Sequence, residues 1–277
     1  MILVNGEYND QIDLSDRGFQ YGDGLFETIA VKDGKPVSFD RHLARLKVGC
    51  ERLFIPFPGT ELLTFEAQEL SRQSSDSVLK IILTRGSGGR GYRQPDVIKT
   101  TRVLSLHPFP EYSPTYKEEG IIARFCNTRL GINPTLAGIK HLNRLEQVIA
   151  RAEWFDPSIQ EGIMLDINDH VIEGTMTNLF YAKNNTLYTS PVDRSGIAGI
   201  IRGIIIQISS KIGHPVVEHK FTRKQLLSAD ELFLTNSIIG IWPVRQIDNA
   251  FFEKGLITQR LQAMLTQFYN ETIKDDF

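Results

Sequence analysis

The sequence has little cysteine, almost no net charge and no long apolar run. Its two cysteines, Cys50 and Cys126, lie far apart and lack metal-ligand spacing, so we expect neither a disulfide framework nor a zinc or other metal site. The 31 Lys and Arg residues nearly balance the 33 Asp and Glu residues, which argues against nucleic acid or an anionic membrane as partners. No apolar run approaches the roughly 20 residues that cross a bilayer, and no basic stretch followed by an apolar one begins the chain. The sequence therefore predicts a cytoplasmic protein.

The length and composition favour a folded protein of two domains. Hydrophobic residues make up 41% and charged residues 23% of the 277 positions, an ordinary balance for a globular protein. This length is too great for one small core and too short for three domains, so two domains sharing a cleft are expected. Three prolines in positions 107–114 favour an extended linker. We predict an α+β fold with an N-terminal α/β domain at 1–107, a linker at 108–115 and a C-terminal α/β domain at 116–277 that contains Lys140.

The spacing of apolar residues predicts the main strands and helices. Runs rich in β-branched residues and bounded by turn formers indicate strands, whereas apolar residues three or four apart indicate helices. Ser38 is expected to cap a helix that leaves Arg45 off its apolar stripe. The expected stripes are Leu43, Leu46, Cys50 and Leu53 in that helix and Leu142, Leu145, Ile149 and Ala152 in a second, a third helix is expected at 199–213, and strands are expected at 78–83, 101–106, 162–166, 171–173, 178–181 and 231–235.

Lys140 has small and apolar neighbours just ahead of the second stripe. Desolvation destabilises an ammonium in such a place and makes the neutral amine available for a Schiff base. A surface lysine fits the same pattern, so Lys140 needs supporting groups. One is the glycine-rich helix start at 195–202, whose free N–H groups could bind phosphate. Arg45 is another, because a guanidinium forks onto phosphate oxygens, although an ordinary helix start and a solvent-exposed arginine remain alternatives.

Two further stretches suggest contacts with a ligand. Glu173 ends an expected strand, where its carboxylate could keep a ring nitrogen of a cofactor protonated; a solvent-facing strand glutamate is the alternative. The stretch 84–92 has four glycines and two arginines directly after a strand. Glycines allow close backbone approach and arginines recognise carboxylates. We interpret this stretch as a carboxylate grip, with a flexible surface hairpin as the alternative.

Several motifs occur in the order typical of one enzyme group. They are DRGFQYGDGLF at 16–26, HLARL at 42–46, EGTMTNLF at 173–180 and GIIR at 199–202. Together they resemble the fold-type IV pyridoxal-phosphate (PLP) enzymes over nearly the whole chain. Within that group, RGSGGRGY at 85–92 and RLGINPTLAGIKHLNRLEQ at 129–147 are similar to the aminodeoxychorismate lyases.

The resemblance implies a two-domain fold with PLP in the cleft between the domains. It implies that Lys140 is joined covalently to PLP and that Glu173 contacts the pyridine nitrogen. The other implied contacts are Arg45 and the backbone at Ile200 and Ile201 with the phosphate, Asn236 and Ser237 with the region of the phosphate and substrate, and Arg90 and Tyr92 with a substrate carboxylate. A homodimer, in which a loop of the neighbour completes the cleft, is implied as well.

The activity that the resemblance implies is conversion of 4-amino-4-deoxychorismate to 4-aminobenzoate and pyruvate in folate biosynthesis. Lys140 would remove the C4 proton, and Thr28 is a candidate second proton donor. A D-amino-acid or branched-chain aminotransferase of the same fold is the alternative, although Phe26 stands where the D-amino-acid enzymes have a tyrosine. A PLP-binding protein without catalysis is the alternative from a different class.

Overall fold

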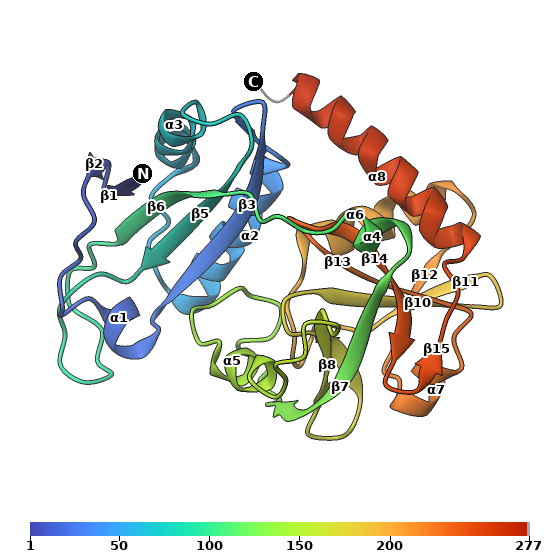
Figure 1. Ribbon diagram of the computed structural model, residues 1–277. Helices are drawn as coiled ribbons and strands as arrows, with labels where there is room; N and C mark the ends of the chain where they lie inside the picture. The colour runs from blue at the N-terminus through green and yellow to red at the C-terminus, as the bar shows by residue number, and fades with distance from the viewer. Residues whose placement is uncertain (276–277) are drawn as a thin grey trace. The chain divides into compact units, whose positions relative to one another are not determined.

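The computed structural model describes residues 1–275 and confirms the mixed α+β class (Figure 1). Contacts divide the chain into two compact units. The first contains Met1–Pro110, Ile139–Asn143 and the chain from Tyr269 onward, and the second contains Glu111–Gly138 and Arg144–Phe268. Lys140, expected in the C-terminal domain, falls in the first unit. The domain limits at 107 and 116 stay a prediction.

The first unit is built on an antiparallel six-stranded sheet with the order β2-β1-β6-β5-β3-β4. Its strands are β1 (Ile2–Val4), β2 (Glu7–Tyr8), β3 (Gly24–Lys32), β4 (Lys35–Pro36), β5 (Ser77–Thr84) and β6 (Thr101–Pro108), and its helices are α1 (Arg17–Tyr21), α2 (Phe39–Leu53) and α3 (Thr60–Ser71). The strands expected at 78–83 and 101–106 are therefore confirmed.

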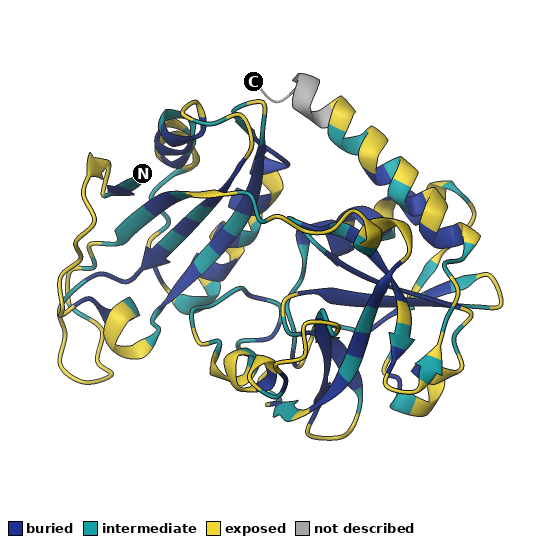
Figure 2. Ribbon diagram, in the orientation of Figure 1, coloured by how far each residue is buried: buried dark blue, intermediate teal, exposed yellow. Residues whose placement is uncertain are grey.

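The two faces of this sheet differ in burial (Figure 2). Along β3, Leu25, Glu27 and Ile29 are buried on the side of α2, whereas Phe26 and Thr28 between them are half-buried. This alternation follows from the two-residue period of a strand. The opposite side of the sheet, away from α2, carries Phe26, Thr28, Lys80 and Ser105. We call it the far face.

The helix α2 starts where the sequence predicts, but Ser38 does not cap it as predicted. Ser38 has φ +53°, and over the described residues its side chain makes no capping hydrogen bond. A capping side chain needs an extended backbone to reach the first free N–H groups, and the left-handed conformation of Ser38 turns the hydroxyl elsewhere. The predicted stripe is buried at Leu43, Leu46 and Cys50.

The second unit contains a nine-stranded sheet with the order β12-β11-β10-β13-β14-β7-β8-β9, in which β15 also pairs with β14. Since β9 pairs with β10 as well as β8, part of the sheet closes on itself. The strands are β7 (Ile121–Leu130), β8 (Glu161–Asp166), β9 (Val171–Gly174), β10 (Asn178–Lys183), β11 (Thr186–Thr189), β12 (Val216–Glu218), β13 (Glu231–Asn236), β14 (Gly240–Ile247) and β15 (Ala250–Phe251), and the helices are α4 (Thr115–Glu118), α5 (Leu145–Arg151), α6 (Ile200–Lys211) and α7 (Arg223–Leu227). The last helix, α8 (Leu256–Asp275), belongs to this unit over residues 256–268.

The core of the second unit lies inside the closed part of its sheet. Leu179, Leu234 and Trp242 come from neighbouring strands and pack together with Phe221. The helix predicted around Leu145 is confirmed, but its apolar side chains face outward: Leu145 is 72% and Ile149 57% exposed. Cys50 and Cys126 are both free and buried. Over the described residues, no helix has the length and apolar character needed to cross a membrane.

Candidate active site

Lys140 lies in an extended segment that pairs with the start of β3. The N–H of Phe26 donates to the carbonyl of Lys140 (3.0 Å), and the N–H of Leu142 donates to the carbonyl of Gly24 (3.0 Å). The amine Nζ of Lys140 lies 4.3 Å from the centroid of the Phe26 ring. The backbone of β3 thus fixes the lysine, and an apolar ring shields one side of its amine.

Arg45 of α2 is held by a buried glutamate of β3, Glu27. Arg45 Nε donates to Glu27 Oε1 (2.8 Å) and Nη2 to Oε2 (2.5 Å), while His42 Nδ1 lies 2.6 Å from Oε2. Glu27 and His42 are each 1% exposed. Burial alone would raise the pKa of Glu27, but the charges of Arg45 and His42 and their hydrogen bonds lower it to about 2. Arg45 is therefore an oriented guanidinium, and the solvent-exposed alternative is wrong.

The electrostatic surroundings of His42 act against its protonation. Burial lowers the pKa of His42 below its ordinary value, and the positive charges of Arg45 and Lys140 act in the same direction, although Glu27 opposes them. The direction of this shift favours the neutral ring of His42, and among the groups around Glu27 the charge of Arg45 lowers the pKa of that carboxylate most.

A row of polar residues crosses the far face next to Lys140. Thr28 of β3 stands opposite Lys80 of β5, which stands opposite Ser105 of β6. Lys80 Nζ is 5.7 Å from the centroid of the Phe26 ring, the ring that Lys140 also contacts. Lys80 is not among the residues that the sequence pattern singled out. A lysine in the middle of the apolar run 78–83 was the available signal, but its place beside Thr28 depends on strand register.

The two arginines of the glycine-rich stretch 84–92 differ in burial: Arg85 is buried and Arg90 is exposed. Arg85 is 4% exposed and is used by the protein itself: it donates to Asp23, to the carbonyl of Leu53 (2.7 Å) and to the carbonyl of Phe54 (2.8 Å). Arg90 is exposed, and the ring of Tyr92 is 89% exposed. Of the two arginines, Arg90 is the one available to a ligand.

In the second unit, Glu173 lies where β9 meets β10. It is 3% exposed and accepts hydrogen bonds from the N–H of Ile197 (2.9 Å) and from Asn178 Nδ2 (3.2 Å). Asn178 also stands opposite Glu173 in the strand pairing. Desolvation lowers the pKa of Arg144, against the opposing charges of Glu173 and Glu146. The solvent-facing alternative for Glu173 is therefore wrong.

The start of α6 adjoins this glutamate. Over the described residues, no side chain caps the helix, whose N-cap is Gly199, and Ile200 and Ile201 are buried. A Cβ at Gly199 would lie 1.9 Å from Asn178 Oδ1, so only glycine allows this approach. Free N–H groups at the start of a twelve-residue helix suit a phosphate, and a buried carboxylate nearby suits a protonated ring nitrogen. These residues fit PLP.

Asn236 and Ser237 lie at the hairpin between β13 and β14. Asn236 Oδ1 accepts from the N–H groups of Ile238 (2.8 Å) and Ile239 (2.9 Å), and Asn236 Nδ2 donates to the carbonyl of Met176 (3.1 Å). The side chain of Asn236 thus ties its own turn to the loop after β9. Ser237 is half-buried in that turn. Asn236 therefore lies near the loop that follows Glu173, and its side-chain hydrogen bonds go to the backbone of that loop and of its own turn.

A buried glutamate that the sequence analysis missed supports the loop after Glu173. Glu161 accepts from the N–H of Gly162 (2.8 Å), from Thr175 and Met176, and from Thr177 Oγ1 (3.0 Å). Burial raises the pKa of Glu161, and these hydrogen bonds offset the effect only in part. An isolated glutamate in a strand pattern carries no signal of this role.

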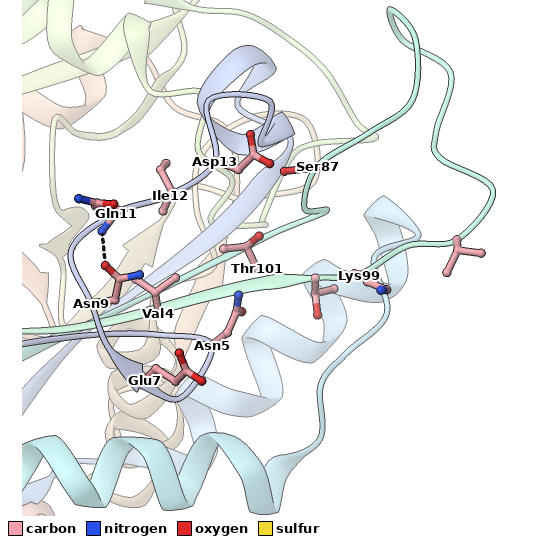
Figure 3. Close-up of a pocket in the computed structure, with 12 residues that line it drawn as sticks. Val4, Asn5, Glu7, Asn9, Gln11, Ile12, Asp13, Ser87, Lys99 and Thr101 are labelled. Carbon is pink, nitrogen blue, oxygen red and sulfur yellow. Dashed lines mark hydrogen bonds between the residues drawn. The ribbon is translucent and has the colours of Figure 1, made fainter.

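A cavity of about 520 Å³ opens in the first unit beside β1 and β6 (Figure 3). Over residues 1–275, its lining includes neither Lys140 nor Arg90. Asp13 and Ser87 face each other at its rim, so this cavity adjoins the root of the glycine-rich stretch. The described residues hold no group of three or more His, Cys, Asp or Glu side chains arranged to bind a metal.

The match to known proteins defines the class of this chain. Residues 24–247 match the amino-transferase class IV family. The chain belongs to that family.

Individual relatives narrow the comparison. The chain is 37% identical to the aminodeoxychorismate lyase of Vibrio harveyi, covering 96% of this chain and 99% of the relative. It is 33% identical to a putative branched-chain-amino-acid aminotransferase of Methanocaldococcus jannaschii, covering 94% and 93%. The crystal structure of 4-amino-4-deoxychorismate lyase from Pseudomonas aeruginosa matches with a TM-score of 0.94 and 43% identity, covering 96% of this chain and 98% of that one.

Proposed function

We propose that the protein is a PLP-dependent lyase that converts 4-amino-4-deoxychorismate to 4-aminobenzoate and pyruvate in folate biosynthesis. The observation that carries the proposal is the placement of the Lys140 amine against Phe26, beside the polar row of Thr28 and Lys80. The high similarity to lyases from Vibrio harveyi and Pseudomonas aeruginosa supports the same reaction.

A residue is proposed to contact each part of PLP: its aldehyde, its ring nitrogen and its phosphate. Bound PLP supplies an electron sink for the charge left when a proton leaves the carbon next to the amino nitrogen. Lys140 would hold it covalently. The proposed contacts are Glu173 with the ring nitrogen, Arg45 and the N–H groups of Ile200 and Ile201 with the phosphate, and Asn236 and Ser237 with the region next to the phosphate.

Two side chains of the first unit would move protons. Lys140 Nζ would take the proton from C4 of the substrate, because a neutral amine can act as a general base. Thr28 lies two residues from Phe26 on the same face of β3, so its hydroxyl is the proposed second donor. The C4 proton would be lost together with the enolpyruvyl group, which leaves with its ether oxygen as enolpyruvate and takes up one proton to become pyruvate. The ring that remains is aromatic, which favours the products.

Two carboxylates on the substrate need cationic or hydrogen-bonding partners. Arg90 and Tyr92 are proposed for one of them, since both side chains are exposed on the glycine-rich stretch. Lys80 is proposed for the other, since it lies on the far face beside Thr28 and Phe26. A lysine is suited to this role because its ammonium acts as a point charge without a fixed fork.

The aminotransferase alternative uses the same lysine and the same phosphate contacts. The similarity to the Methanocaldococcus jannaschii protein, a putative branched-chain-amino-acid aminotransferase, favours it. Against it, Phe26 offers a ring without a hydroxyl next to Lys140, and Lys80 adds a cation that a substrate with two carboxylates would use.

One experiment separates the three functions. The holoenzyme is mixed with aminodeoxychorismate and assayed for pyruvate and 4-aminobenzoate, and separately mixed with amino acids and assayed for the pyridoxamine form of the cofactor. We expect both products of the lyase reaction, and none from the Lys140→Ala variant. Conversion of amino acids alone would favour the aminotransferase, and a coloured protein without turnover would favour a non-catalytic PLP-binding protein.

A homodimer is proposed as the assembly. Large apolar side chains are exposed in each unit: Leu14 is 75% and Phe19 65% exposed in the first, and Leu145 is 72% and Val148 60% exposed in the second. Clustered apolar residues on a surface are typical of an interface between proteins. Light scattering should give twice the 31.4 kDa chain mass, and a monomer at micromolar concentration would contradict the proposal. The cytoplasmic location stays a prediction.

A further inference from the structure

We propose that Arg17 is a positioning residue that shapes the glycine-rich stretch 84–92, together with Arg93 directly after it, and thereby places Arg90 and Tyr92 for the substrate carboxylate. The inference rests on the proposed function, in which that stretch binds substrate. It adds a residue that touches neither substrate nor cofactor and acts through the loop.

Arg17 holds the stretch through its backbone. The guanidinium is 4% exposed, and its Nη1 donates to the carbonyls of Gly91 (3.0 Å), Arg93 (3.3 Å) and Gly88 (3.5 Å). The N–H of Arg17 donates to the carbonyl of Gly86 (2.9 Å). One residue of α1 thus binds the stretch at its start, middle and end.

The orientation of Arg17 is itself fixed by Asp23. Arg17 Nε donates to Asp23 Oδ2 (2.9 Å), which also accepts from Arg85 Nε (2.8 Å). Burial alone would raise the pKa of Asp23, but the hydrogen bonds and charges of Arg85 and Arg17 lower it. A carboxylate shared by two arginines stays ionised and keeps one guanidinium directed at the stretch.

The helix that carries Arg17 is fastened to the sheet. Asp16 accepts from the N–H of Gly18 (2.8 Å) as the cap of α1 and from Thr84 Oγ1 (2.8 Å) at the end of β5. Asp16 also pairs with Ser87. Arg17 therefore approaches the stretch from a rigid base, even though α1 has only five residues.

The stretch folds closely over the guanidinium. Gly89 has φ +79°, and a Cβ there would lie 2.4 Å from the carbonyl oxygen of Arg93 and 3.2 Å from Arg17 Nη1. A segment with four glycines has a large conformational entropy when free. The glycines of the stretch have no side chains that could order it. The hydrogen bonds from the buried Arg17 guanidinium to its carbonyls therefore hold its backbone in one conformation.

Arg17 also supports the aromatic ring of the stretch. Its guanidinium lies 5.0 Å from the centroid of the Tyr21 ring, and that ring packs edge to face with Tyr92 at 5.7 Å. Tyr92, with its 89% exposure, would have little else to hold it. Arg17 thus positions both the backbone around Arg90 and the side chain of Tyr92.

The test is the Arg17→Lys variant as holoenzyme with aminodeoxychorismate. A lysine can still pair with Asp23 but cannot fork onto three carbonyls. Because substrate would then have to order the stretch on binding, KM should rise roughly 10- to 100-fold, with kcat within about threefold and the absorbance of bound PLP unchanged. An unchanged KM, or a loss of kcat together with loss of PLP, would overturn the inference.

A second variant keeps the test decisive if Arg17→Lys fails to fold. Gly89→Ala alters an exposed position and presses on the same contact from the other side, so the same rise in KM is expected. Asp96→Asn is the matched control, because it removes only an exposed pair with Arg93 (2.9 Å), and its kinetics should equal those of the parent. A Gly89→Ala variant with the KM of the parent would contradict the inference.

Proteolysis separates this inference from the proposed function. Trypsin should cleave after Arg90 or Arg93 at least tenfold faster in Arg17→Lys than in the parent, because a released stretch reaches the protease more often. If the parent shows no lyase activity, the proposed function fails, and faster cleavage would still support the positioning role. Equal cleavage rates would remove that role whatever the enzyme converts.

Discussion

Two buried glutamates, one in each unit, show that the pKa of the same buried side chain can shift in opposite directions, depending on its partners. Glu27 and Glu161 are each 1% exposed. Glu27 is held by Arg45 and His42, whereas Glu161 is held by backbone N–H groups and threonine hydroxyls. Their pKa values move in opposite directions, to about 2 for Glu27 and upward for Glu161.

The difference lies in what each glutamate positions. A desolvated carboxylate stays ionised when a cation compensates it, and is driven toward its protonated form when only dipoles do. Glu27 is a fixed negative charge that orients the guanidinium of Arg45. Glu161 is a many-fold hydrogen-bond acceptor that shapes the backbone from Thr175 to Thr177, directly after Glu173. The following predictions test this contrast.

The largest effect is expected for Glu27→Gln. The change leaves the charge of Arg45 without its buried counter-charge, and removing one partner of such a pair costs about 3–5 kcal/mol. Urea unfolding should show this loss, and equilibrium binding should show weaker affinity for PLP. A loss of stability below about 1 kcal/mol would contradict the account of Glu27.

A matched control is available in the same unit. Glu66 is 2% exposed and binds Arg102 through both oxygens, with a shortest distance of 2.7 Å. Glu66→Gln should also lower stability but should leave PLP affinity unchanged, because Arg102 is given no role in cofactor binding. Equal losses of PLP affinity in both variants would mean that Glu27 acts only through stability.

The next effect concerns acid. The pKa of Glu27 in the folded protein, about 2, lies below its ordinary value of 4.5. Between these values the unfolded chain takes up a proton that the folded protein refuses, so stability falls as pH falls. The contribution lost is roughly 3 kcal/mol. Urea unfolding between pH 6 and 2 should show this slope in the parent and a shallower one in Glu27→Gln; equal slopes would contradict the prediction.

A smaller effect is expected for Glu161→Gln. An amide keeps one acceptor oxygen but puts an NH₂ group opposite donors, which should cost about 1–2 kcal/mol. The pKa of Glu161 is raised, so its share of stability is present at low pH and is lost as pH rises. The destabilisation by the variant should therefore shrink as the pH rises above the ordinary glutamate pKa of 4.5. A destabilisation that grows over this range would reverse the assignment.

The smallest effect is expected for an ion pair in contact with solvent. Lys183 and Asp230 are 2.7 Å apart, with side chains 39% and 50% exposed. Water and salt screen such a pair, so Lys183→Met should change stability by less than about 0.5 kcal/mol. Urea unfolding provides the measurement, and a change above about 1 kcal/mol would show that burial is not what separates Glu27 from ordinary pairs.

Local patterns and the order of the motifs were enough to predict several elements and candidate residues. Alternating or apolar runs predicted β5 and β10, and three separate motifs contain the candidates Lys140, Arg45 and Glu173. In the structure, Lys140 is hydrogen-bonded to β3, Arg45 to Glu27 and Glu173 to Ile197.

What the sequence could not predict depends on contacts between distant segments. Lys80 gains meaning from the register that sets it opposite Thr28, 52 positions earlier. Arg85 and Arg90 look alike in the same stretch, but only the fold shows that Asp23 occupies the first. The apolar residues of α5 predicted a helix correctly, yet periodicity alone does not tell whether the apolar face is buried or exposed.

The most direct test of the account is to find the lysine that carries the cofactor. Borohydride reduction of the holoenzyme followed by peptide mapping should place PLP on the peptide that contains Lys140. Lys80 is the internal competitor, since its amine also lies near the Phe26 ring. Label on Lys80, on any other lysine, or on none would contradict the central claim.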